Sequence, residues 1–126
     1  MKKTLLFLLI SFFAVLPAMA DGPAISFKNK THDFGTIKST KGAVSYEYAF
    51  TNTGDKPLVI VNVTNGGCGC TTPEFPKEPI APGKTGKIKI TFNPEGRRGE
   101  FRREVKVKTN VSSKRESLRF NGVIVP

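Results

Sequence analysis

The stretch Gly66-Gly67-Cys68-Gly69-Cys70-Thr71 contains the only two cysteines of the chain and separates two segments with β-strand patterns. Two adjacent glycines make an extended ladder costly to order, so a strand that leads into this stretch must end there. The sequence therefore predicts strands on both sides of the motif and a break in the sheet at the motif itself.

A single glycine separates Cys68 from Cys70, and this spacing leaves three roles open for the site formed by Cys68, Gly69, Cys70 and Thr71. An extended backbone would point the two thiols to opposite faces, whereas a turn at Gly69 in a conformation reserved for glycine would bring both sulfurs to one side. The motif is then a structural or binding loop, a redox pair, or a two-thiolate site for a soft metal such as Cu(I). A disulfide here would close a very small loop and stabilise the fold little.

The residues around the motif favour the structural or binding loop. Thiol-exchange enzymes usually present their cysteines at a helix N-terminus, but Pro73 and Pro76 follow the motif and predict no helix. After residue 20 the chain has no methionine and one histidine, His32, so a full ligand set for a soft metal is lacking. We expect His32 to be a surface or turn residue, and we expect no metal and no cofactor.

The segment before the motif contains two predicted strands joined by a turn. Residues 43–51 alternate, with four apolar side chains on one face: Val44, Tyr46, Tyr48 and Phe50. The turn that follows contains Asn52 and Gly54, and we expect Gly54 to supply a positive φ. Residues 58–63 are an apolar run rich in β-branched residues, which predicts a central strand covered on both faces.

The segment after the motif repeats this pattern. Pro82 and Gly83 suit the second and third positions of a type II turn. Residues 87–93 alternate cleanly, and further apolar faces occur over residues 101–107 and 118–124. About seven strands, with turn signals roughly every 8–12 residues, predict a single immunoglobulin-like antiparallel β-sandwich.

The first twenty residues have the pattern of a cleaved signal peptide. Two lysines precede a thirteen-residue apolar run, and Ala18-Met19-Ala20 is a small-x-small cleavage site. The run is shorter than the roughly 20 residues of a spanning helix, so we expect no transmembrane segment after cleavage. We expect an exported domain of residues 21–126, periplasmic or extracellular, with eighteen basic and ten acidic residues and a net charge of +8.

This positive charge limits the partners to be expected. An exported basic protein is expected to meet an unknown protein or an anionic envelope component rather than nucleic acid. The candidate basic patch has five members: Arg97, Arg98, Arg102, Lys106 and Lys108. A solvated strand face gives the same pattern. The sequence contains no catalytic constellation, because one histidine supports no Ser-His-Asp set, and a binding or structural module is favoured over an enzyme.

Several motifs together resemble domain-of-unknown-function family 1573, a family of exported bacterial proteins. They are residues 52–55 with Pro57-Leu58, residues 68–71 with Pro73, residues 81–83, Gly99 and Asn110. The resemblance covers residues 27–121 and implies a fold like the immunoglobulin-like domains of the ASPM–SPD–Hydin and PapD-like groups. It implies no activity, because the family is uncharacterised.

Overall fold

The computed structural model describes residues 22–126, which form eight strands and no helix. The predicted signal peptide therefore lies outside the described residues. The strands are β1 (Ile25–Phe27), β2 (Thr31–Lys38), β3 (Val44–Asn52), β4 (Ile60–Val63), β5 (Thr71–Glu74), β6 (Thr85–Phe92), β7 (Gly99–Thr109) and β8 (Glu116–Val125). Within residues 22–126 there is no helix that could cross a membrane.

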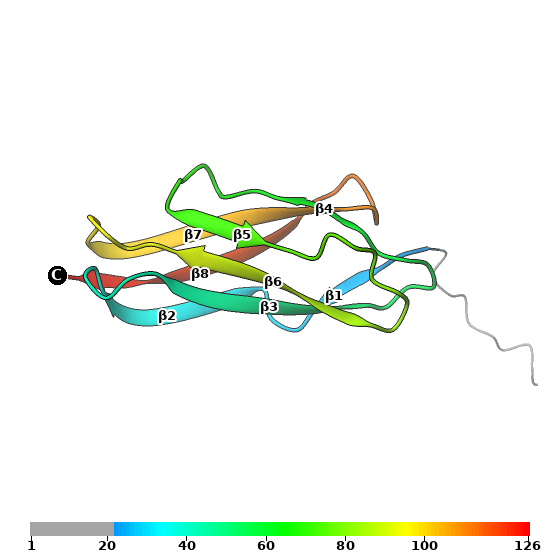
Figure 1. Ribbon diagram of the computed structural model, residues 1–126, viewed down its shortest axis with the longest axis horizontal. Helices are drawn as coiled ribbons and strands as arrows, with labels where there is room; N and C mark the ends of the chain where they lie inside the picture. The colour runs from blue at the N-terminus through cyan, green and yellow to red at the C-terminus, as the bar shows by residue number, and fades with distance from the viewer. Residues whose placement is uncertain (1–21) are drawn as a thin grey trace, which may run out of the picture.

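The strands form two sheets of four that pack face to face (Figure 1). The first sheet has the order β1-β3-β6-β5 and the second has the order β2-β8-β7-β4. Apart from the division of the first strand, this is the arrangement of a constant-type immunoglobulin sandwich. The predicted immunoglobulin-like fold is confirmed.

The number and direction of the strands differ from the prediction in one place, the N-terminal strand. It is divided between the sheets, since β1 pairs with β3 and β2 pairs with β8, which gives eight strands rather than about seven. The β2–β8 pair is parallel, although an antiparallel sandwich was expected. A register shift between Asp33 and Thr36, with Gly35 at a φ of 73°, interrupts β2 and protects this edge of the sheet from further pairing.

The core comes from the alternating faces that the sequence shows. β3 and β6 pair in register from Val44 opposite Phe92 to Thr51 opposite Thr85, and their inward side chains meet those of β7 and β8. Four phenylalanines lie at the centre: the Phe92 and Phe101 rings stack at 4.5 Å, and the Phe120 ring lies edge-on to Phe34 and Phe92 at 5.8 and 5.7 Å. The core holds the sheets together without a disulfide between them.

The prediction of a central strand over residues 58–63 is wrong. The strand is the short edge strand β4, and Val61 is 49% exposed. Leu58 is separated from it and makes an isolated bridge to Ile80. A register shift between Ile60 and Asn62 turns part of this run outward. The apolar run itself does not show this, because a strand buried on two faces and a strand buried on one face can have the same composition.

Asn52, expected as a turn residue, is a fully buried hub at one end of the sandwich. Its amide nitrogen donates to the carbonyls of Lys56 at 2.8 Å and Ile80 at 2.9 Å. Its amide oxygen accepts from the backbone N–H groups of Gly54 at 2.9 Å and Ala24 at 3.3 Å. One side chain therefore joins the turn, the N-terminal segment and the loop before β6.

The two predicted turn glycines act in different ways. Gly83 has a φ of 80°, and Lys84 donates to the carbonyl of Ala81 at 3.0 Å, which is the geometry of a type II turn with Pro82 at its second position. Gly54 does not have the expected positive φ. A Cβ at Gly54 would lie 2.6 Å from the backbone nitrogen of Ala24, so this position needs glycine for close packing of the N-terminal segment.

His32 lies on β2 rather than in a turn. It is half-buried, and its ring stacks on Tyr46 with a centroid distance of 3.8 Å and an interplanar angle of 11°. This contact joins β2 of the second sheet to β3 of the first, so His32 contributes to packing along the side of the sandwich.

Candidate functional site

The cysteine loop, residues 64–70, crosses from β4 in the second sheet to β5 in the first. Its first turn runs from Asn65 to Cys68, whose backbone nitrogen donates to the Asn65 carbonyl at 3.3 Å. Gly66 and Gly67 have φ values of 72° and 80°, as the two central residues of a type I′ turn require. The Asn65 side chain accepts from the Gly67 N–H at 2.9 Å and supports the same turn.

Gly66 also fixes this loop against β7. A Cβ at Gly66 would lie 2.6 Å from the backbone oxygen of Glu104, so no other residue fits without displacing the strand. The loop is therefore held beside β7 at the place where β4 ends.

The second turn brings the two cysteines together. Thr71 donates its N–H to the Cys68 carbonyl at 3.2 Å, and Cys68 and Cys70 form a disulfide across a Cα–Cα distance of 5.1 Å. The expectation for Gly69 is wrong, because Gly69 has no positive φ and open space surrounds its Cβ position. The glycine conformations that the loop needs are those of Gly66 and Gly67.

Thr71 differs from the other residues predicted for this site. It is the first residue of β5, only 3% exposed, and pairs with Phe92 of β6. It therefore anchors the loop to the first sheet. Pro73 lies within β5, where its missing N–H is tolerated because β5 is an edge strand.

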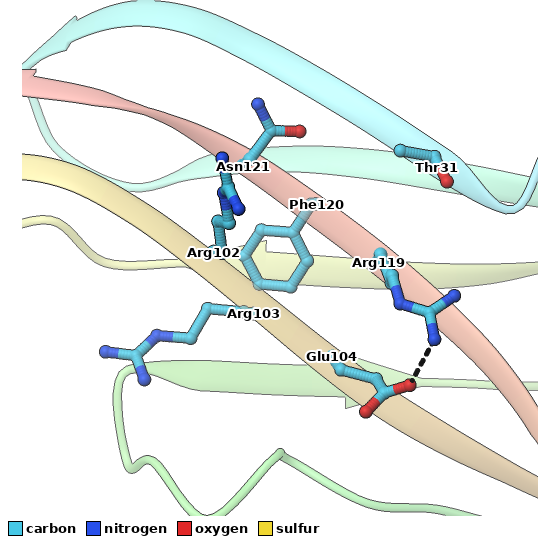
Figure 2. Close-up of a pocket in the computed structure, with 7 residues that line it drawn as sticks. All are labelled: Thr31, Arg102, Arg103, Glu104, Arg119, Phe120 and Asn121. Atoms are coloured by element: carbon cyan, nitrogen blue, oxygen red, sulfur yellow. Dashed lines mark ion pairs between the residues drawn. The ribbon is translucent and has the colours of Figure 1, made fainter.

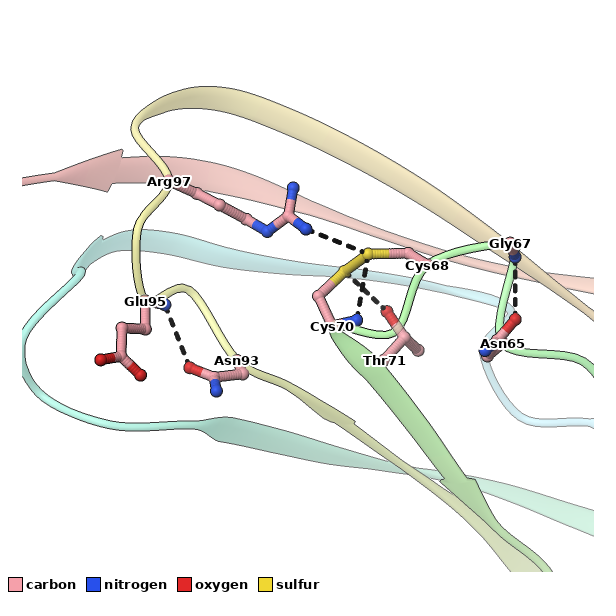
Figure 3. The surroundings of a disulfide bond; sticks show 8 residues. All are labelled: Asn65, Gly67, Cys68, Cys70, Thr71, Asn93, Glu95 and Arg97. Atoms are coloured by element: carbon pink, nitrogen blue, oxygen red, sulfur yellow. Dashed lines mark hydrogen bonds between the residues drawn. A yellow bond between two sulfur atoms is a disulfide. The ribbon is translucent and has the colours of Figure 1, made fainter.

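Arg97, predicted as part of the basic patch, lies instead against the disulfide (Figure 3). Its guanidinium donates to the Sγ of Cys68 at 3.4 Å, and the N–H of Cys70 donates to the same sulfur at 3.1 Å. The Sγ of Cys70 lies 3.5 Å from the Thr71 hydroxyl. The two sulfurs thus have unequal surroundings, since the guanidinium lies on Cys68 alone.

The disulfide speaks against the soft-metal alternative in this oxidised form. The sulfurs of Cys68 and Cys70 are bonded to each other, so neither is a thiolate that could bind a metal. Residues 22–126 contain no group of three or more histidine, cysteine, aspartate or glutamate side chains placed to hold a metal.

A second candidate site is a hollow on the outer face of the second sheet, with a volume of about 470 Å³ (Figure 2). Residues of three strands line it: Thr31 of β2, Arg102, Arg103 and Glu104 of β7, and Arg119, Phe120 and Asn121 of β8. The register places Arg102 opposite Asn121 and Glu104 opposite Arg119. The hollow therefore has three arginines and one carboxylate.

The charges in this hollow are only partly paired. Glu104 forms ion pairs with Arg119 at 2.9 Å and Lys106 at 3.9 Å, whereas Arg102 has no acidic partner among residues 22–126. A hydrogen bond from Ser117, and then the charges of Lys106 and Arg119, hold the pKa of Glu104 below its ordinary value. Glu104 is thus ionised at neutral pH. Arg102, which is exposed, and Arg103, which is half-buried, are the cations of the hollow without an acidic partner among residues 22–126.

The structure divides the predicted basic patch. Arg102, Lys106 and Lys108 lie on the outer face of β7, whereas Arg97 and Arg98 belong to the loop before it. Sequence reasoning missed Arg119 on β8. The alternation around Leu118 and Phe120 would have placed Arg119 outward, but nothing in the sequence shows that β8 lies beside β7 in this register.

The comparisons with known proteins agree with this architecture. Residues 25–124 match the family described as "Protein of unknown function (DUF1573)". The chain belongs to this family. None of the curated proteins matches the chain.

Solved structures show what this DUF1573 domain is similar to in fold. A protein of unknown function from Porphyromonas gingivalis W83 is 17% identical with a TM-score of 0.69, over 89% of this chain and 51% of that one. The VesB protease of Vibrio cholerae is 14% identical with a TM-score of 0.61, over 80% and 31%. The human CEP192 ASH/PapD-like domain 7 is 13% identical with a TM-score of 0.60, over 80% and 84%. The chain spans about half of the first protein and about a third of the second.

Proposed function

We propose that this DUF1573 domain is an exported binding module of the cell envelope whose outer β7–β8 face holds an acidic segment of a partner protein. The observation that carries the proposal is Arg102, which lies in the hollow beside Arg119 and has no acidic partner among the described residues. A guanidinium presents a planar fork of donors that matches a carboxylate, so Arg102 suits a glutamate or aspartate of a partner.

The charge sequence along β7 favours a protein over a uniform polyanion. Its exposed and half-exposed outer positions carry charges of both signs, with Glu100, Arg102, Glu104, Lys106 and Lys108 in that order. A uniformly anionic polysaccharide would meet two carboxylates along this line, and like charges brought together oppose binding. A folded or extended polypeptide can place its carboxylates opposite the cations and leave the two glutamates unopposed.

Binding of an acidic peptide is expected to depend on Arg102 and to be opposed by Glu104. The probe is a fluorescent peptide with alternating glutamate and serine residues, and the measurement is its anisotropy at low and high salt. Arg102→Gln is expected to weaken binding about three- to tenfold, since an exposed charge-assisted contact contributes about 1 kcal/mol. Glu104→Gln is expected to strengthen binding, because it removes the ionised carboxylate and releases Arg119.

Lys41→Gln is the matched control, because it removes one positive charge from an exposed turn residue outside the hollow. Equal weakening by Arg102→Gln and Lys41→Gln would mean that only net charge matters, and the proposed site would be wrong. Tighter binding of an anionic polysaccharide than of the peptide, still dependent on Arg102, would replace the partner protein by an envelope polymer.

Export is part of the same proposal and has its own test. We expect the protein isolated from cells to begin at Asp21, because Ala18-Met19-Ala20 has the small residues that signal peptidase requires. Mass spectrometry of the N-terminal peptide from separated cell fractions measures this directly. Ala18→Arg is expected to block cleavage and leave the precursor. Full-length protein that begins at Met1 in the cytosolic fraction of wild-type cells would contradict export.

A further inference from the structure

The Cys68–Cys70 disulfide connects residues that are two positions apart and joins no separate parts of the fold. The stabilisation from a crosslink grows with the loop that it closes, so this bond contributes little to the stability of the domain. Its ends are also held independently, by the Thr71 pairing with β6 and by the close packing of Gly66 on β7. The bond can therefore open without unfolding of the domain.

The surroundings of the two sulfurs differ in a way that favours negative charge on one of them. The Sγ of Cys68 accepts from the Cys70 N–H at 3.1 Å and from the Arg97 guanidinium at 3.4 Å (Figure 3). Arg97 forms no ion pair within residues 22–126, so its charge is available to the sulfur. Both cysteines are partly exposed, and exposed Gly69 separates them, which leaves an approach for a small thiol.

We propose that Cys68–Cys70 is a thiol–disulfide exchange site in which Cys68 is the sulfur that leaves as a thiolate. The incoming thiolate of a dithiol attacks the Sγ of Cys70, the S–S bond breaks, and its electron pair remains on the Sγ of Cys68. The second thiol of the reductant then attacks its own sulfur in the mixed disulfide and releases Cys70. The protein gains two electrons and two protons, and the dithiol becomes a disulfide.

This site is independent of the hollow, since Arg97 and the cysteines do not line it. Among residues 22–126, Arg97 is the charged side chain that donates to a sulfur of the pair, whereas the Glu95 carboxylate of the same loop points away from the disulfide (Figure 3) and the Glu104 carboxylate is engaged by Arg119. Arg97 acts as a positioning residue that stabilises the leaving sulfur. Loss of peptide binding in the hollow would leave this proposal unchanged, and the reverse also holds.

Single-cysteine variants test the predicted asymmetry. Cys70→Ser leaves the Cys68 thiol with its two donors, and Cys68→Ser leaves the Cys70 thiol. The measurement is the rate of alkylation by iodoacetamide from pH 5 to pH 10. The Cys68 thiol is expected to ionise well below the ordinary thiol pKa of about 8.5, and the Cys70 thiol at or above it. Equal profiles, or a more acidic Cys70, would overturn the proposal.

The intact disulfide gives a second measurement that a purely structural role would not move. We expect dithiothreitol to reduce the native protein without denaturant, with an unchanged circular dichroism spectrum. Arg97→Gln is expected to slow this reduction about three- to tenfold, because a less stabilised thiolate leaves more slowly. Arg98→Gln is the matched control, since Arg98 is the neighbouring exposed arginine and makes no hydrogen bond to either sulfur. Reduction only in denaturant, or equal rates for the two variants, would overturn the proposal.

Discussion

Asn52→Ala is expected to lower the free energy of unfolding by about 3–5 kcal/mol, since it empties a fully buried site and removes four hydrogen bonds to part-buried backbone groups. The carbonyl of Lys56 loses its side-chain donor, the carbonyl of Ile80 keeps only the N–H of Leu58, and the N–H groups of Gly54 and Ala24 lose their acceptor. Equilibrium unfolding in urea, followed by circular dichroism, measures the change. The dependence of the free energy on urea should stay the same, because the variant exposes the same surface on unfolding.

Asn65→Ala is the matched control for this prediction. It removes an asparagine that accepts one exposed hydrogen bond, from Gly67, so a loss of about 0.5–1 kcal/mol is expected. Asn52→Asp keeps the shape but replaces two donated hydrogen bonds by a buried carboxylate that faces two carbonyls. Burial raises the pKa of such a carboxyl, so the destabilisation should be greatest at neutral pH and decrease as the pH falls toward 4. Equal losses for Asn52→Ala and Asn65→Ala would contradict the role of Asn52 as a hub.

The sequence predicted the fold where a local pattern determines which way side chains point. The alternation in β3 and β6 identified Tyr48, Ile88, Ile90 and Phe92 as inward residues, and all four are buried. The Pro82-Gly83 pair indicated its turn, because a type II turn needs a positive φ at one defined position. Each of these features depends on a few neighbouring residues, and such information is present in one sequence.

The failures concern the roles of individual glycines and the contacts between distant segments. Gly54 and Gly69 were expected to supply positive φ, but Gly54 instead makes room for the chain near Ala24, and Gly66 and Gly67 form the turn. A glycine needed for its backbone conformation and one needed for space look the same in a sequence. Leu58 to Val63 likewise gave no sign that it would lie at the edge of a sheet.

The candidate site likewise combines features that a local sequence pattern shows with contacts that it does not show. Cys68 and Cys70 were visible as a pair, but the guanidinium on Cys68 comes from Arg97, which the sequence placed in a basic patch. Arg119 enters the hollow because β8 pairs with β7 in one register. The sequence therefore identified Cys68, Cys70, Arg97 and Arg102 but not Arg119, and only the contacts between distant segments determined which groups act together.

Phe120→Ala is expected to lower the free energy of unfolding by about 3–5 kcal/mol, the usual cost of truncating a buried phenylalanine. Phe120 is 1% exposed, and its ring lies edge-on to Phe34, Phe92 and Phe101 with centroid distances of 5.8, 5.7 and 6.3 Å. The variant loses these contacts and leaves a cavity between the sheets, because β-strands fixed by two neighbours cannot collapse into it. Most domains are stable by only about 5–15 kcal/mol, so little stability would remain.

Two further variants separate the effect of packing from that of the strand. Phe120→Leu fills part of the space and should cost less than Phe120→Ala, while Val123→Ala on the outer face of β8 should cost about 0.5 kcal/mol or less, since that side chain is 37% exposed. Urea unfolding of the three variants gives this order directly. A Phe120→Ala protein as stable as Val123→Ala would mean that the sheets close over the missing ring, and the rigid aromatic centre described for this sandwich would be wrong.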